Sequence, residues 1–174
     1  MAVTYQLARV PAGYLAACRQ SADASPDGDH GWDPPAEDQL DLDWAPMLLR
    51  RVCELGDLDE AHTQALREAT DGDTTIDLAF LDVPPHDIAP FGTTPTALSE
   101  AQVARIADLL DQIDFPAILA ALPRSEKRAA RRIGSWAPEI TGGPRKYLRH
   151  HFEALRTFYR TAADRRLLVA LWAD

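Results

Sequence analysis

Cysteine and long apolar segments are both scarce in this chain. Charged residues interrupt every apolar run well short of the ~20 residues that a membrane-spanning helix requires, so we expect no association with a membrane. The two cysteines, Cys18 and Cys53, are too few for a disulfide framework and lack the spacing of metal ligands. The sequence therefore predicts a protein of a reducing compartment, the cytoplasm.

A secretion signal is also poorly supported. Residues 15–18 read Leu-Ala-Ala-Cys, the cleavage box of bacterial lipoproteins. The segment before this box holds Gln6, Arg9 and Pro11 where a signal peptide has an uninterrupted apolar stretch, and no basic residue precedes that stretch. We therefore expect Cys18 to be a small residue of the core.

Complete catalytic, metal-binding and phosphate-binding motifs are missing. The sequence contains neither a phosphate-binding loop of Walker type nor a dinucleotide fingerprint. Ser135 lacks the flanking glycines of a hydrolase elbow. The calcium-like run that begins at Asp23 has Pro34 where a bidentate Glu is required. His150 and His151 are adjacent, so a helix would point them about 100° apart and they could not share a metal. We therefore predict no metal and no other cofactor.

Composition and length fit one globular domain. Hydrophobic residues make up 46% of the 174 residues and charged residues 26%, values close to the average for a folded domain. A chain of this size typically buries about 70% of the surface that is exposed when it is unfolded. We therefore expect residues 1–174 to form a single domain with its own core.

Charge is distributed unevenly along the chain. The formal net charge is −9, and residues 23–43 contain eight carboxylates without a Lys or Arg. Residues 124–149 contain eight Lys or Arg against two Glu. We expect a mobile acidic loop that recognises a partner protein, and a second hypothesis is that this loop lies against residues 124–149 and shields them from anions. Nucleic-acid binding by residues 124–149 is an alternative that the net negative charge disfavours.

Hydrophobic periodicity predicts an α+β fold. Alternation indicates strands near residues 3–8 and 75–83, and a short apolar run indicates a central strand over 167–172. Spacings of three and four residues indicate helices that begin at Pro11 and Pro144 and helices over 43–55, 58–69, 99–113, 115–122 and 124–133. We expect a small mixed β-sheet that includes the N- and C-terminal strands as neighbours, packed against several helices with a long C-terminal helix.

Several local strings resemble one family. These strings are Leu40–Trp44, Phe91-Gly92, Leu98–Val103, Tyr147-Leu148, Phe152–Leu155 and Phe158–Arg160. As a set they are similar to the YfbM-like family of uncharacterised bacterial proteins, the domain of unknown function 1877. The resemblance implies a compact α+β fold without a known cofactor or activity, so it brings no catalytic residue. In this chain Asp43 adjoins Trp44 and no His follows until His62, which departs from the usual spacing of that family.

Asp43 and Trp44 are the first two candidate binding residues. An indole offers apolar area and one hydrogen-bond donor, so Trp44 beside Asp43 could mark a ligand pocket. The helical spacing of Trp44 with Met47 and Leu48 favours core packing instead. Asp43 is also a plausible N-cap of the helix predicted over 43–55.

Arg145 and Lys146 are the other two candidates. They follow Gly142 and Gly143 at the start of the C-terminal helix, where free amides beside two cations can hold an anion. A helix start with ordinary surface charges is the simpler interpretation. On these grounds we expect a binding or protein-interaction module without catalytic activity. The alternative is a small hydrolase-like enzyme that uses carboxylates which cannot be singled out among the 27 Asp and Glu.

Overall fold

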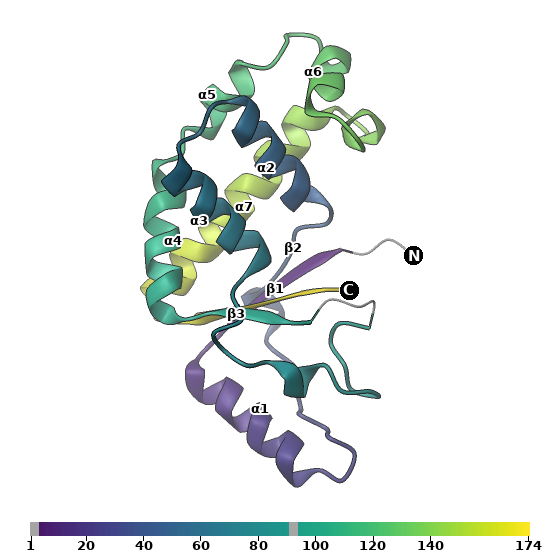
Figure 1. The fold of residues 1–174 in the computed structure, drawn as a ribbon, viewed down its shortest axis with the longest axis vertical. Helices are drawn as coiled ribbons and strands as arrows, with labels where there is room; N and C mark the ends of the chain where they lie inside the picture. Colours follow the sequence, from purple (N-terminus) through teal and green to yellow (C-terminus); the bar gives the residue numbers. More distant parts are fainter. Residues whose placement is uncertain (1–3, 91–93) are drawn as a thin grey trace.

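A four-stranded antiparallel sheet lies across the middle of the molecule (Figure 1). The computed structural model describes residues 4–90 and 94–174, so Val3 of the first predicted strand and the Phe91-Gly92 string lie outside the described residues. The strands are β1 (Tyr5–Val10), β2 (Gln39–Asp41), β3 (Thr96–Leu98) and β4 (Leu168–Ala173), in the order β2-β1-β4-β3.

The predicted N- and C-terminal strands are neighbours, and β4 is central. β1 and β4 pair along their whole length, from Tyr5 opposite Ala173 to Val10 opposite Leu168. The α+β class is therefore confirmed. The described sheet is purely antiparallel rather than mixed, because the direction of pairing depends on the path between strands and not on the periodicity within one.

Each face of the sheet has its own core. Successive side chains of a strand point to opposite faces. Leu7 and Val169 therefore belong to the core under the helices, whereas Val10 and Leu168 belong to the core on the other face. Burial on both faces explains why β4 is apolar throughout.

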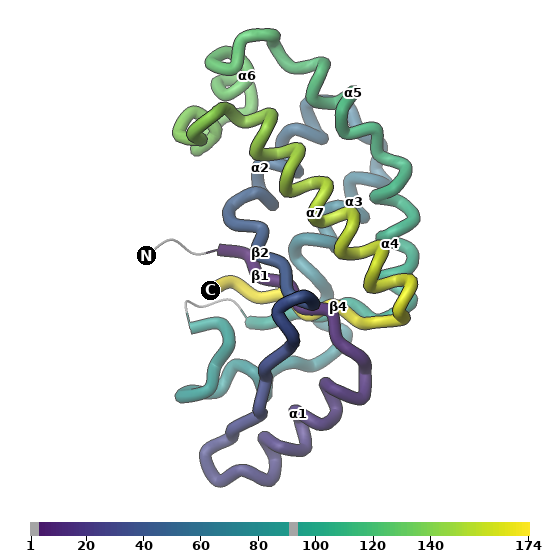
Figure 2. The backbone as a smooth tube through the Cα atoms, turned by 180° about the vertical axis from the view of Figure 1, so that it is seen from behind, coloured from purple at the N-terminus to yellow at the C-terminus, as the bar shows by residue number. Residues whose placement is uncertain are grey.

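The helical layer covers one face of the sheet and extends well beyond it (Figure 1). Its helices are α2 (Ala45–Leu55), α3 (Glu60–Asp71), α4 (Glu100–Gln112), α5 (Phe115–Ala120), α6 (Glu126–Ile133) and α7 (Pro144–Asp164). The helix predicted over 99–113 is α4, and a capping box of Ser99 and Gln102 starts it. Figure 2 shows α7 running from the neighbourhood of α6 down to the sheet, with α4 beside its second half.

The long C-terminal helix α7 is confirmed, together with its apolar stripe. Leu148, Phe152, Leu155 and Phe158 are all buried. The ring of Phe115 on α5 stacks on Phe152 with 4.2 Å between ring centroids. Because α7 contacts α2, α4, α5 and α6, it is the central helix of the helical layer.

The second face of the sheet is covered by α1 (Ala12–Ala24) and by irregular segments. Cys18 is buried on α1, as expected for a core residue, and both cysteines are free thiols. The strand predicted over 75–83 is wrong, because these residues form bends and the 3-10 helix η2 (Ala79–Leu81). The Asp77 carboxylate accepts the Ala79 amide at 2.9 Å, and such an aspartate turn competes with extended pairing.

The first part of the acidic segment, residues 23–43, packs on this same side, whereas its end forms β2 and packs Leu40 and Leu42 against the helical layer. Buried His30 accepts the Trp32 amide through Nδ1 at 3.0 Å and donates from Nε2 to the His86 carbonyl at 2.6 Å. Asp38 on η1 (Ala36–Asp38) accepts from Arg9 at 2.7 Å and from Arg165 at 2.5 Å.

The basic helix α6 lies at the far end of the molecule from α1 and the tip of the acidic segment (Figures 1 and 2). The part of the acidic segment beside α1 is therefore too far away to shield α6, although Asp43 at the end of the segment contacts Tyr147 on α7. Charge counted along the sequence does not say which elements the fold brings together.

Candidate functional site

The starts of α2 and α7 meet, although their contacting residues are 104 positions apart. The Tyr147 hydroxyl donates a 2.9 Å hydrogen bond to Oδ2 of Asp43. Asp43 therefore does not cap α2 as predicted: the N-cap is Trp44, and no side chain caps this helix. Two of the four candidate residues, Asp43 and Trp44, thus adjoin the first turn of α7, which carries Arg145 and Lys146.

Three of the four large hydrophobic side chains that are exposed in the described part of the chain lie at this junction or one turn from it. Trp44 is 37% exposed, Met47 45% and Trp136 52%. The two indole rings are 6.2 Å apart between centroids and tilted by 57°. We call Trp44, Met47 and Trp136 the aromatic surface. Core packing of Trp44 is thus the wrong interpretation, because α2 buries Leu48 and Val52 instead.

The backbone of Trp136 adopts an unusual conformation. Its φ is +71°, in the left-handed region that bulky residues avoid at a cost of order 1–3 kcal/mol. The residue directly precedes the 3-10 helix η3 (Ala137–Glu139). Half of its side chain remains in solvent, so burial offsets little of this cost. A strained backbone that presents an exposed indole indicates a surface formed for contact.

The polar groups beside the aromatic surface are poorly suited to acid–base catalysis. Burial, and then the hydrogen bond to Asp43, raise the pKa of Tyr147, so the phenol stays protonated. Burial, and then the charge of His150, lower the pKa of His151, so its imidazole is neutral at pH 7. The Tyr147 and His151 rings lie 4.4 Å apart between centroids, and Nδ1 of His151 is buried without a hydrogen-bond partner. These groups fix the α2–α7 junction.

The side chain of Arg145 makes hydrogen bonds within the protein and is not available to bind an anion at the start of α7. Its guanidinium donates to the carbonyls of Leu122 and Pro123 at 3.0 and 2.6 Å, and to the Glu126 carboxylate at 2.5 Å. A Cβ atom on Gly143 would lie only 2.6 Å from Oε2 of Glu126. The negative group at this helix start is thus the protein's own Glu126. Of the two predicted anion-binding residues, Lys146 alone is exposed.

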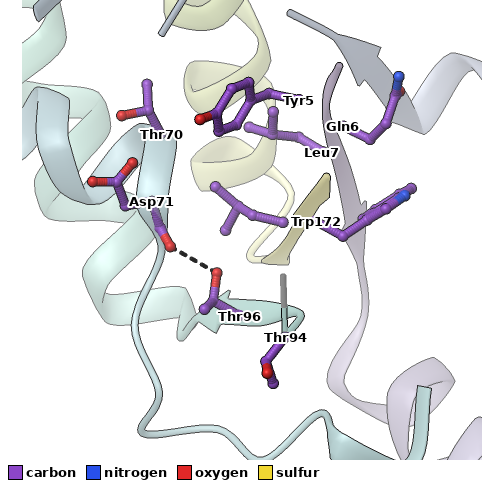
Figure 3. Close-up of a pocket in the computed structure, with 9 residues that line it drawn as sticks. Tyr5, Gln6, Leu7, Thr70, Asp71, Thr94, Thr96 and Trp172 are labelled. Carbon is purple, nitrogen blue, oxygen red and sulfur yellow. Dashed lines mark hydrogen bonds between the residues drawn. The ribbon is translucent and has the colours of Figure 1, made fainter. Parts of the chain in front are cut away.

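A cavity of about 290 Å³ lies where β1 and β4 meet the end of α3 (Figure 3). Three of its polar side chains are engaged within the fold. The Thr96 hydroxyl donates to the Asp71 carbonyl at 2.8 Å, the buried Thr70 hydroxyl donates to Leu66, and the Asp71 carboxylate pairs with Arg50 at 2.5 Å. Gly72 passes so close to Thr96 that a Cβ atom would lie 2.2 Å from its hydroxyl oxygen. The cavity holds no nucleophile with an adjacent base.

One Asp–His pair has the geometry that orients a general base. His62 Nδ1 donates to Oδ2 of Asp59 at 2.6 Å, and Asp59 also accepts the Ala61 amide as N-cap of α3. The other ring nitrogen, Nε2, is buried without a partner, so no hydroxyl or thiol stands where a base would activate it. Within residues 4–90 and 94–174, no three His, Cys, Asp or Glu are grouped to hold a metal ion.

Trp136 and Tyr147 were not among the candidates chosen from the sequence. Periodicity assigned Tyr147 to the inner stripe of α7, and Trp136 falls in a stretch that reads as an ordinary turn. One signal could have found Trp136, because a tryptophan among Gly, Ser and Pro has no helical or strand face on which to be buried.

The fold places the chain among α+β proteins whose antiparallel sheet joins both terminal strands beneath a helical layer. Residues 53–172 match the model of the family described as Domain of unknown function (DUF1877), and the chain belongs to this family. The resemblance expected from local strings is thus confirmed. Trp44 precedes the matched range, and Trp136 and Tyr147 lie within it.

One solved structure shares the fold. It is YfbM from Escherichia coli, a protein of unknown function, which superposes with a TM-score of 0.51 over 97% of this chain and 98% of that chain. The two sequences are 16% identical, so the likeness concerns the fold alone. No curated protein matches the chain. Among the helices of the described residues, none is both long and apolar enough to cross a membrane.

Proposed function

We propose that this protein is a protein-interaction module, a single domain over residues 1–174, that binds a partner protein through the aromatic surface. The sequence suggested the acidic segment as the recognition element. We now prefer the aromatic surface, because residues of the acidic segment such as His30 and Asp38 are engaged in holding it to the fold.

The observation that carries this proposal is the convergence of two exposed tryptophans from distant parts of the sequence. Trp44 precedes α6 in the sequence and Trp136 follows it, yet their rings lie together in the fold. Met47 follows Trp44 one turn along α2. Tryptophan and methionine are enriched in protein interfaces, and tryptophan dominates interface hot spots. Contiguous apolar patches on monomeric proteins are commonly functional.

A catalytic role has less support among the described residues. In the cavity at the end of α3, Thr70, Asp71 and Thr96 are engaged in internal interactions, and Nε2 of His62 has no hydrogen-bond partner. In our proposal the module acts in the cytoplasm without a cofactor. The free thiols of Cys18 and Cys53, both buried, are compatible with a reducing compartment.

The test is an affinity capture from the source lysate with three immobilised proteins. They are the wild type, the double variant Trp44→Ala/Trp136→Ala, and the control Val83→Ala, which removes the fourth exposed large hydrophobic residue. Proteins captured by the wild type and the control but lost with the double variant are identified, purified and titrated against each protein. We expect the double variant to weaken binding at least about 30-fold, the effect of losing a single hot-spot residue of about 2 kcal/mol.

Stability measurements accompany the capture. Both tryptophans are partly exposed, so we expect the double variant to keep the wild-type circular dichroism spectrum and a cooperative unfolding transition. A partner that binds the double variant as tightly as the wild type would contradict the proposal. A metabolite that raises the melting temperature by several degrees and is turned over would favour the enzyme alternative.

A further inference from the structure

We infer that the partner presents an acidic segment carrying at least one large apolar side chain, which lies over α6 with the apolar side chain against the two tryptophans. This inference rests on the proposed function and adds the chemistry of the partner. It is carried by the ion pairs of the molecule, by the position of α6 and by the composition of the chain.

The exposed cations of α6 have no carboxylate partner among the described residues. They are Lys127, Arg128, Arg131 and Arg132. Several arginines of other elements are paired, such as Arg50 with Asp71, Arg105 with Glu68 and Arg160 with Asp111, whereas single exposed arginines such as Arg67 and Arg166 have no such partner in the part of the chain that the structure describes. What distinguishes α6 is that one short helix carries four such cations, in a chain that has 27 carboxylates for only 18 Lys and Arg. Carboxylates are in excess, yet none is placed against these four cations.

The unpaired cations and the aromatic surface belong to one end of the molecule. α6 packs against α2 and against η3, the element that Trp136 precedes. Figure 1 shows α6 and the loop after it at the end of the molecule farthest from α1. A partner that reaches Trp44 and Trp136 therefore meets the field of α6, which favours an acidic binding segment and speeds its approach.

The opposite rim of the surface sets the orientation of the partner. Asp41 is exposed beside the start of α2, and the Asp43 carboxylate is held by Tyr147. Like charges disfavour a carboxylate there. The acidic residues of the partner should therefore lie on the α6 side of the indoles rather than on the β2 side.

The test is a selection from a phage-displayed library of random linear peptides on the wild-type protein. The same library is passed over Trp44→Ala/Trp136→Ala and over Arg128→Gln/Arg132→Gln, which changes only exposed residues of α6. Arg67→Gln/Arg166→Gln is the matched control, because it removes two exposed arginines on α3 and at the end of α7. Enriched peptides are synthesised and titrated by fluorescence anisotropy at several salt concentrations.

We expect enriched peptides to combine several Asp or Glu with Trp, Phe or Leu. Their affinity should fall about tenfold for the α6 variant, which corresponds to about 0.7 kcal/mol per cation, and should change little for the control. It should also weaken with added salt, since the Debye length shrinks from about 30 Å at 0.01 M to about 8 Å at 0.15 M.

The outcomes separate the two proposals. Peptides that need both tryptophans but are neutral or basic would overturn the acidic partner and leave the aromatic surface as a binding site. Peptides that ignore the tryptophans, or no enrichment at all, would overturn both.

Two further occupants are tested with the same variants. Mixed-sequence DNA that binds in a tryptophan-dependent manner would assign the surface to nucleic acid and overturn the acidic protein segment. Concentration-dependent association in sedimentation at low salt, lost in the double tryptophan variant, would assign it to the acidic segment of a second copy and overturn a foreign partner.

Discussion

The acidic and basic ends of the molecule use their charges in different ways. At the acidic end, Asp38 is nearly buried between Arg9 and Arg165, and the His30 ring is hydrogen-bonded at both nitrogens. At the basic end, the cations of α6 lack carboxylate partners and Trp136 is half exposed on a left-handed backbone. The charges of a segment can thus either hold it to the rest of the fold or remain free at the surface. The interaction partners of its side chains show which of the two applies.

The largest expected effect on stability concerns α7, the helix that runs through the helical layer. Leu155→Ala should lower the free energy of unfolding by about 2 to 5 kcal/mol, because Leu155 is fully buried and truncation leaves a cavity. Urea denaturation measures the loss. Glu153→Ala on the exposed side of the same helix is the control. Surface substitutions typically cost less than about 0.5 kcal/mol. A loss below that level for Leu155→Ala would show that this face of α7 does not belong to the core.

A smaller effect is expected from the ion pairs that Asp38 forms with Arg9 and Arg165. Asp38→Asn should cost about 1.5 to 3 kcal/mol, the range for hydrogen bonds to charged groups, because Arg9 and Arg165 lose the carboxylate between them. A cost near zero in urea denaturation at pH 7 would mean that both ends carry equally free charges.

The same variant should change the response to acid. The hydrogen bond from Arg165 holds the pKa of Asp38 below its ordinary value of 3.8. The lowered pKa contributes stability that is present above pH 3.8 and is lost as the pH falls through the pKa of the folded protein. Wild-type stability should therefore decline more steeply than that of Asp38→Asn between about pH 4 and pH 2.

The smallest effect is expected from the exposed carboxylates of the acidic segment. Neutralising Asp23, Asp33 and Glu37 as amides should raise retention on heparin no more than neutralising Asp57, Glu60 and Asp108 does, because α1 and the loop after it lie far from α6. Elution salt from a heparin column measures the difference. Clearly stronger retention of the first variant would revive the shielding hypothesis.

Local sequence was sufficient for elements whose signals lie within one turn or one strand. Ser99 and Gln102 start α4 because a capping box needs only four neighbouring residues. The stripe of α7 follows from its 3.6-residue period, and the buried run in β4 from its composition. The family could also be identified, because its strings are local.

Elements that depend on a partner strand were not predictable in this way. β2 and β3 are three residues each and exist through pairing with β1 and β4. Residues 75–83 alternate like a strand but find no edge to pair with, and Asp77 turns the chain into η2. Strand pairing depends on segments that are distant in the sequence. Alternation of apolar and polar residues is therefore necessary for a half-buried strand but is not sufficient.

The candidate site divides in the same way. The sequence by itself determined that Trp44 lies near the start of a helix, that Arg145 lies in the first turn of α7 and that the stretch around α6 is basic, because each of these is a property of neighbouring residues. Tertiary structure alone decided that Trp136 meets Trp44 and that Glu126 takes up Arg145. The physical reason is that exposure and pairing depend on which surfaces the folded chain leaves facing water, and only the packing of distant segments settles that.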